Sequence, residues 1–165
     1  MDLKSVPTRG RTLDYAAGIY DIFEPMLMFG REGEINDQLI KLLDIQDSHT
    51  ILDIGCGTGV ITQVVSTGLN SEKGGLVTGI DAAGKMIQGA RKKRESNKCR
   101  FEVAAAEDLK FEDNSFDSIL STLFFHHIQL DLKKKAFAEA FRVLKPGGKM
   151  VISDMHIPTT FFGWL

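Results

Sequence analysis

Three glycines at alternating positions, close behind an acidic residue, are the most chemically informative feature of the sequence. Asp53 opens the run Asp-Ile-Gly-Cys-Gly-Thr-Gly, whose glycines are Gly55, Gly57 and Gly59. Glycine lets the backbone turn tightly and approach a bound molecule where any Cβ would collide. The run therefore predicts a loop that holds a small molecule. The alternative is a glycine turn in an unrelated α/β domain.

A second carboxylate is predicted to lie beside this loop. Residues 76–80 read as a strand that ends at Asp81, which comes 22 residues after Gly59. An acid at about this interval commonly accepts hydrogen bonds from both hydroxyls of a ribose. The alternative is that Asp81 only caps the helix that follows it.

Two histidines and a tyrosine are the candidate catalytic residues. His126 and His127 follow the predicted fourth strand, and Tyr20 lies in an N-terminal region with a helical pattern. A histidine whose pKa is near neutrality can remove a proton from an oxygen, nitrogen or carbon acid. The alternatives are structural hydrogen bonds for the histidines and a core position for Tyr20, which otherwise is expected to cover the bound molecule.

A basic run at residues 91–94, Arg-Lys-Lys-Arg, suggests a phosphate site at first sight. It lies at the end of a predicted helix, where basic side chains interact favourably with the helix dipole. This position favours a solvated face over a ligand site.

Alternating strands and helices must position these residues. Strands are predicted at 50–54, 76–80, 100–104, 116–121 and 149–154, and helical stripes of apolar residues separate most of them. Residues 145–148, Lys-Pro-Gly-Gly, are predicted to end the last helix. The alternation predicts an α/β fold, a Rossmann-like, doubly wound and mostly parallel sheet with helices on both faces. Ligands bind outside the carboxyl ends of the strands in such a sheet.

Composition and charge restrict the function classes. The chain has 165 residues, 43% of them hydrophobic and 25% charged, which is typical of one globular domain; we expect a flexible N-terminus at 1–12 and a single domain at 13–165. The net charge of -2 gives no broad positive surface for nucleic acid. No signal peptide or membrane span is evident, so we expect a cytoplasmic protein. Two cysteines form neither a disulfide framework nor a metal cluster.

The spacing of the glycines separates two ligand classes. The dinucleotide fingerprint requires Gly-x-Gly-x-x-Gly, and its last position is filled here by Val60, which disfavours a nicotinamide-dependent oxidoreductase. The run instead resembles the first motif of class I methyltransferases that use S-adenosyl-L-methionine (SAM). Segments 77–91, 104–120, 121–128 and 141–154 resemble the later motifs of that family in the same order. Segment 13–23 is similar to the branch that contains ubiquinone and menaquinone biosynthesis C-methyltransferases.

The resemblance implies a role for each matching residue. The loop glycines would pack against the methionyl part of SAM, Asp53 would help to position its amine, and Asp81 would hold the ribose. The other cofactor-binding residues that it implies are Cys56 in the loop, Ala82 and Met86 beside the adenine, Ala106 and Glu107 at the adenine edge, and Ser121 at the methionyl end. Two positions depart from the family pattern, because Ala105 and Ala83 stand where relatives often carry an aspartate and a helix-capping serine.

The resemblance also leads us to expect further strands after Asp154, so the sheet is predicted to lack the family's last two strands. An unpaired sheet edge tends to recruit a partner. Residues 156–165 are unusually apolar for a free tail. We therefore predict that this tail covers the edge or packs into a homodimer.

The predicted function is a SAM-dependent methyltransferase that transfers a methyl group to a small, apolar or aromatic acceptor and releases S-adenosyl-L-homocysteine. Candidate residues for the acceptor pocket, with the core as their alternative location, are Met26, Met28, Phe29, Phe124 and Phe125. Methyl transfer is an in-line displacement, so alignment alone can supply most of the catalysis. The alternative function is a non-catalytic SAM-binding module that regulates or completes a partner protein.

Overall fold

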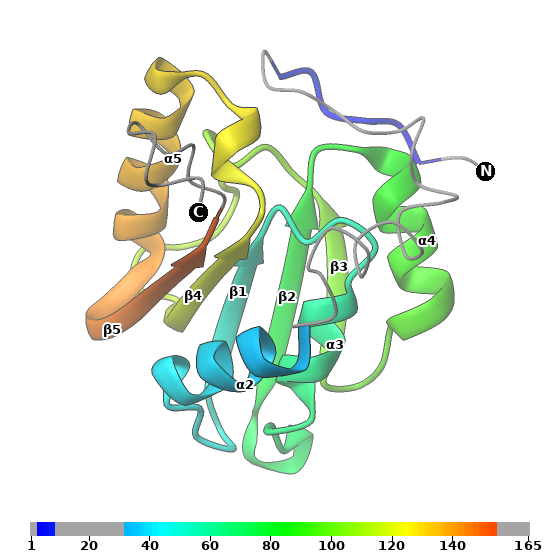
Figure 1. Cartoon of the computed structure of the whole chain (residues 1–165), viewed down its shortest axis with the longest axis vertical. Helices are drawn as coiled ribbons and strands as arrows, with labels where there is room; N and C mark the ends of the chain where they lie inside the picture. Colours follow the sequence, from blue (N-terminus) through cyan, green and yellow to red (C-terminus); the bar gives the residue numbers. More distant parts are fainter. Residues whose placement is uncertain (1–2, 9–31, 155–165) are drawn as a thin grey trace, which may run out of the picture.

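Five parallel strands form the central sheet of the protein, seen in a computed structural model that describes residues 3–8 and 32–154 (Figure 1). The strands are β1 (Thr50–Ile54), β2 (Leu76–Asp81), β3 (Cys99–Val103), β4 (Phe116–Thr122) and β5 (Leu144–Ser153). Their order is β3-β2-β1-β4-β5, and each neighbouring pair is parallel. The α/β fold predicted from the alternation of strands and helices is confirmed.

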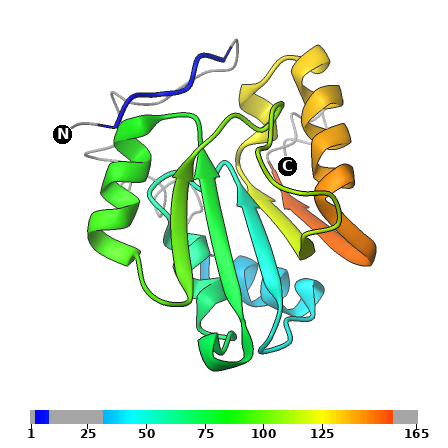
Figure 2. The same ribbon diagram turned by 180° about the vertical axis from the view of Figure 1, so that it is seen from behind.

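Helices cover both faces of this sheet. On one face lie α2 (Glu32–Leu43), α3 (Val60–Ser66) and α4 (Gly84–Arg94), and on the other lies α5 (Leu130–Val143). Figure 2, seen from behind, shows α5 in front of β4 and β5. Two short 3-10 helices are η1 (Ser71–Lys73) and η2 (Phe125–His127).

The two cores follow from the alternation of side chains along each strand. Ile51 and Leu120 are buried in the core beneath α2, α3 and α4, whereas their neighbours Leu52 and Ile119 are buried in the core beneath α5. Strands of a parallel sheet that are covered on both faces read as continuous apolar runs. This burial explains why the sequence of β1 shows no alternation of polar and apolar residues.

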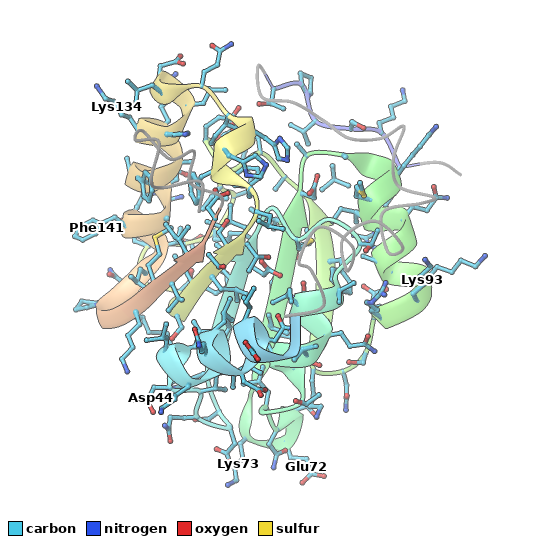
Figure 3. All side chains as sticks on the ribbon, in the orientation of Figure 1. Asp44, Glu72, Lys73, Lys93, Lys134 and Phe141 are labelled. Atoms are coloured by element: carbon cyan, nitrogen blue, oxygen red, sulfur yellow. The ribbon has the colours of Figure 1, made fainter. Side chains whose placement is uncertain are left out.

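Helix α5 buries one side and exposes apolar side chains on the other. Its buried residues are Leu132, Ala136, Ala140 and Val143. Phe141 is 82% exposed, and both Phe141 and Lys134 point away from the sheet (Figure 3). The small alanines on the buried side let the helix lie close to the strands.

Strand β5 begins earlier than the sequence predicted. The predicted strand started at Lys149, but Leu144, directly after α5, already pairs with Phe116. Residues 145–148 therefore belong to β5, and the pairing shifts register beside them, between Phe116 and Ser118. Proline is tolerated on an edge strand, and within the described residues β5 pairs with β4 alone.

Several predicted features lie outside the described residues. These are the N-terminal region with Tyr20, Met26, Met28 and Phe29, and the apolar tail after Asp154. The lid role of Tyr20 and the homodimer through the tail therefore stay predictions. Among the described helices, none has both the length and the apolar character that a membrane crossing requires. The residues that the structure describes contain no His, Cys, Asp and Glu grouping suited to a metal ion.

Asp117 links the beginnings of three strands, at the end of the sheet away from the glycine loop. Its carboxylate accepts hydrogen bonds from the Thr50 amide and the Thr50 hydroxyl, both at 2.8 Å, and from Lys145 Nζ, also at 2.8 Å. Although burial on its own raises the pKa of the Asp117 carboxyl, these hydrogen bonds outweigh it and hold the pKa below its usual range.

This geometry predicts a pH-dependent loss of stability. A carboxyl with a lowered folded-state pKa contributes its full stability above the unfolded-state pKa, near 4, and loses it as the pH falls through the folded-state pKa. We expect Asp117→Asn to lower the free energy of unfolding by about 1 to 2 kcal/mol at pH 7. Urea unfolding of both proteins at pH 7 and pH 3 should show the difference shrinking in acid. A difference that is independent of pH would contradict this role.

Candidate functional site

A cleft opens at the carboxyl ends of β1, β2 and β4, with a volume of about 650 Å³ that includes a part open to solvent. The chain forms β1, β2 and β3 in one direction and then returns to the other side of β1 with β4, and ligands bind at such a switch point. The predicted site residues that line the cleft are Gly55, Gly57, Asp81, Ala82, Met86, Ala106, Glu107 and His127.

The glycine loop between β1 and α3 makes the predicted turn with a left-handed backbone at its three glycines. The φ angles are 77° at Gly55, 54° at Gly57 and 83° at Gly59. The amides of Gly55 and Cys56 both donate to the Ile80 carbonyl at 2.9 Å, which fastens the loop to the end of β2. Non-glycine residues rarely adopt three such angles within five positions, so the loop requires its glycines.

Gly59 also has no room for a side chain, although it does not line the cleft. A Cβ at this position would lie 2.3 Å from the ring of Phe101. We expect Gly59→Ala to lower the free energy of unfolding by about 2 to 4 kcal/mol, the sum of the left-handed φ and the overpacking against the ring. Gly74→Ala is the matched control, because Gly74 has a φ of 85° but no atom within 4 Å of an added Cβ. Equal losses in urea unfolding would exclude the ring contact as the cause.

Asp81 joins the glycine loop to the beginning of α4. Its Oδ2 accepts the Gly57 amide at 3.1 Å, and its Oδ1 accepts the Ala83 amide at 2.8 Å. The same carboxylate lines the cleft. Asp81 thus fixes the turn that leads into α4 and also faces the cleft.

The start of α4 receives its cap from the N-terminal segment. Ser5 Oγ accepts a hydrogen bond from the Gly84 amide at 2.9 Å. In the sequence, Ala83 stands where relatives often carry a helix-capping serine. A serine 79 residues away along the chain supplies the cap, and no local pattern could have indicated this contact.

The same segment continues along one wall of the cleft. The Val6 amide donates to the Ala82 carbonyl at 3.0 Å, and Thr8 Oγ1 donates to Glu107 Oε1. Thr8 lines the cleft together with Ala82 and Glu107. The sequence assigned residues 1–12 to a flexible terminus, so Thr8 is a cleft residue that sequence reasoning missed.

The two histidines lie side by side but have different surroundings. His127 lines the cleft, and its amide donates to the Phe124 carbonyl at 3.0 Å. His126 turns its Nδ1 to Asp154 Oδ1, and its amide donates to Asp154 Oδ2 at 3.0 Å. The two imidazole rings lie with their centroids 3.7 Å apart. Asp154, at the end of β5, is therefore a neighbour of the site that the sequence did not assign.

Three predicted site residues, Asp53, Ser121 and Cys56, do not line the cleft. Asp53 is 1% exposed, and its Oδ2 accepts the Thr62 hydroxyl at 2.6 Å. Ser121 is buried and donates to the Ile54 carbonyl at 2.8 Å, which ties β4 to β1. Burial, with the nearby Asp53 charge, raises the pKa of the Cys56 thiol, so Cys56 acts as a small neutral side chain.

Two residues of the basic run also support the site. Arg94 donates to the Thr58 carbonyl in the glycine loop at 3.0 Å, and Arg91 Nε donates to the Phe101 carbonyl at 2.8 Å. Lys92 and Lys93 are exposed. The run is thus partly structural and partly solvated, and it lies outside the cleft lining.

Comparison with known proteins identifies a family for most of the chain. A family model described as a methyltransferase domain matches residues 52–152. The ubiquinone/menaquinone biosynthesis C-methyltransferase UbiE of Geotalea daltonii is 31% identical over 149 residues, which cover 88% of this chain and 62% of that protein. The phosphoethanolamine N-methyltransferase of Triticum aestivum is 35% identical over 123 residues, 73% of this chain and 23% of that protein. The chain spans between 56% and 62% of the length of the quinone methyltransferases that it matches.

Solved structures with the same fold agree with this result. The YcgJ protein from Bacillus subtilis has a TM-score of 0.67 and 30% identity, and the match covers 78% of this chain and 53% of that protein. Phosphoethanolamine N-methyltransferase 2 of Haemonchus contortus, in complex with SAM, has a TM-score of 0.63 and 27% identity, over 79% of this chain and 31% of that protein.

Proposed function

This chain belongs to the class I SAM-dependent methyltransferases, and on that premise we propose that it transfers a methyl group from SAM to a small apolar or aromatic acceptor. The observation that carries the proposal is the cleft at the switch point of the sheet. It brings the glycine loop, the Asp81 carboxylate and the segment with Glu107 around one space. By their chemistry, the three parts suit the methionyl, ribose and adenine portions of SAM respectively.

The residues of the cleft fit SAM as follows. Asp81 lines the cleft and accepts the Gly57 and Ala83 amides, and a carboxylate at this place can accept hydrogen bonds from the two ribose hydroxyls. Met86 and Ala82 provide apolar walls for the adenine. Glu107 also lines the cleft, and its carboxylate can accept a hydrogen bond from the adenine amino group. The glycine loop brings backbone rather than side chains against the methionyl end. When bound there, SAM supplies an electrophilic methyl group on its sulfonium.

The acceptor is proposed to be an aromatic ring that lies against Phe124. The part of the cleft near His127 is apolar, with Leu123, Phe124 and Ile128 in its wall. Phe125, by contrast, is 5% exposed and belongs to the core beneath α5. Several relatives are named as methyltransferases of ubiquinone and menaquinone biosynthesis, which supports a quinol-like acceptor with a ring carbon as the nucleophile.

The catalytic roles are proposed from the positions of the two histidines. His127, which lines the cleft, is proposed as the general base that removes a proton from the acceptor. The Asp154 carboxylate binds both the amide and the imidazole Nδ1 of His126. We propose that these two contacts hold η2, and therefore the His127 ring, in position. The walls of the cleft align the acceptor with the methyl group for in-line displacement.

We also propose that the protein is cytoplasmic, does not bind nucleic acid and forms a homodimer through the outer edge of β5 and the apolar tail. The net charge of -2 supports the proposal that the protein does not bind nucleic acid. Within the described residues β5 has β4 as its one neighbouring strand, which supports the proposal of a homodimer through its outer edge.

A turnover assay tests the proposed function. Purified protein is incubated with methyl-labelled SAM and a panel of acceptors that contains dihydroxy-aromatic quinols, phenols and amines, phosphoethanolamine included. Formation of S-adenosyl-L-homocysteine with an aromatic acceptor, and its absence in Asp81→Ala, is the expected result. Tight SAM binding without turnover on any acceptor would contradict the enzyme and would fit the SAM-binding module instead.

A further inference from the structure

The connection between β3 and β4, residues 104–115, lines the cleft without belonging to a helix or a strand. Its Ala106 and Glu107 form the wall where the adenine edge is proposed to lie. A loop that contributes to a binding site must be held in place by contacts from elsewhere, because its own backbone makes few regular hydrogen bonds. Thr8 and the end of β2 contact the first part of this loop, and α5 holds residues 109–113.

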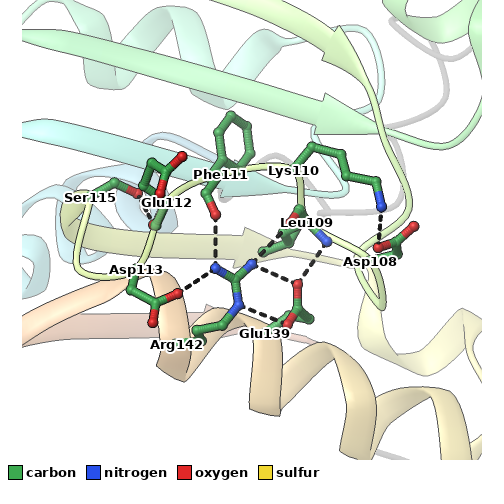
Figure 4. Close-up of polar contacts among 9 residues, drawn as sticks. All are labelled: Asp108, Leu109, Lys110, Phe111, Glu112, Asp113, Ser115, Glu139 and Arg142. Atoms are coloured by element: carbon green, nitrogen blue, oxygen red, sulfur yellow. Dashed lines mark hydrogen bonds and ion pairs between the residues drawn. The ribbon is translucent and has the colours of Figure 1, made fainter.

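Arg142 of α5 forms hydrogen bonds to the loop through its guanidinium group (Figure 4). It donates to the Phe111 carbonyl at 2.8 Å, to the Leu109 carbonyl at 2.9 Å and to Asp113 Oδ1 at 2.7 Å. It also forms a bidentate pair with Glu139, in which Nε donates to Oε1 at 2.9 Å and Nη2 donates to Oε2 at 2.8 Å. This arrangement uses the planar fork of arginine, which the single ammonium group of lysine cannot reproduce.

Glu139, on the same helix, also binds the loop. Its Oε2 accepts the Leu109 amide at 2.9 Å, so both backbone polar groups of Leu109 are bound by one ion pair. The Leu109 side chain is 4% exposed and lies in the core beneath α5. The hydrogen bond from Arg142 lowers the pKa of Glu139 against the opposing effect of partial burial, so the pair stays ionised at neutral pH. Leu109 is thus fixed at three points, two residues from Glu107.

We propose that Glu139 and Arg142 are positioning residues for SAM binding, which set the adenine-edge segment 106–107 from the opposite side of the loop. They do not line the cleft and act through Leu109. The inference rests on the proposed function, because it assigns the adenine to this wall. It adds a specific consequence, which is that a change on α5 alters the affinity for the nucleoside and leaves the methionyl end unaffected.

The test uses the full chain with Arg142→Lys and Glu139→Gln, and Lys73→Met as the control. Lys73 pairs with Asp47 at 2.7 Å at the other end of the sheet, so its loss removes a charge pair without touching the loop. We expect the Kd for SAM to rise about tenfold in Arg142→Lys and by the same factor for adenosine, and to change less than twofold in Lys73→Met. Glu139→Gln retains an acceptor oxygen and is expected to show a smaller rise of two- to fivefold.

Hydrogen exchange provides a readout that a general loss of stability would not reproduce. Amides 106–109 should exchange at least tenfold faster in Arg142→Lys, while the amides of β1 and β2 keep the wild-type rates. Unchanged Kd values in a folded Arg142→Lys protein, or faster exchange throughout the sheet, would overturn the inference. If the wild type binds no SAM, the proposed function fails. The exchange rates of amides 106–109 then decide alone whether Glu139 and Arg142 hold the loop in place.

Discussion

Asp81→Ala is expected to weaken SAM binding by 100-fold or more. The Asp81 carboxylate faces the cleft from the end of β2, between the glycine loop and the start of α4. Hydrogen bonds to a charged acceptor contribute about 1.5 to 3 kcal/mol each, and two ribose hydroxyls would lose that acceptor at once. A loss of about 3 kcal/mol corresponds to a factor of more than 100 in Kd.

The controls for this variant separate binding from folding. Asp81 also accepts the Gly57 and Ala83 amides, so urea unfolding must show that the variant is folded at the titration temperature. Asp47→Ala removes the same charge from an exposed position beside Lys73 and should leave the SAM affinity within twofold of the wild type. If Asp81→Ala bound SAM within threefold of the wild type, Asp81 would only cap α4.

His127→Asn is expected to lower kcat by about 100-fold or more, with the Kd for SAM changed less than threefold. General acid–base catalysis by a positioned side chain typically contributes 10² to 10⁴ in rate. His127 lies in the cleft wall beside Phe124, where an acceptor would meet the methyl group. Asparagine keeps a polar side chain of similar reach but has no basic nitrogen in this pH range.

Single-turnover rates on the acceptor found in the panel measure this effect. His49→Asn is the matched control, because His49 lies at the opposite end of the sheet, where its Nδ1 accepts the Gln46 amide. A His127→Asn protein with kcat within threefold of the wild type would show that alignment of acceptor and methyl group suffices without a base. A rate that falls together with SAM affinity would indicate a collapsed site.

The predicted residues that the structure brings together in the cleft were indicated by local chemistry. A buried apolar run, a glycine loop and an acid at the end of the next strand each have short-range signals, and they meet at one edge because parallel strands share their carboxyl ends. The loop from Gly55 to Gly59 makes the predicted tight turn, with positive φ angles at its glycines. The strand boundaries of β1 to β4 agree with the sequence patterns to within one residue.

The contacts that the sequence could not indicate join residues far apart in the chain. Ser5 caps α4, Asp154 binds His126, and Arg142 holds the loop before β4. Each of these side chains is of a type that is usually exposed and solvated, so only the tertiary structure reveals its partner. The start of β5 was placed too late for a related reason. A proline and two glycines normally end regular structure, but an edge strand with an irregular register tolerates them.

The measurement that tests the central claim most directly is a calorimetric titration of the purified protein with SAM, S-adenosyl-L-homocysteine and NAD. A SAM site in the cleft predicts micromolar binding of the first two ligands, about 8 kcal/mol each, and no binding of NAD. Val60, in place of the last glycine of the dinucleotide fingerprint, is the reason to expect this discrimination. Binding of NAD alone, or of none of the three ligands, would contradict the assignment of the cleft.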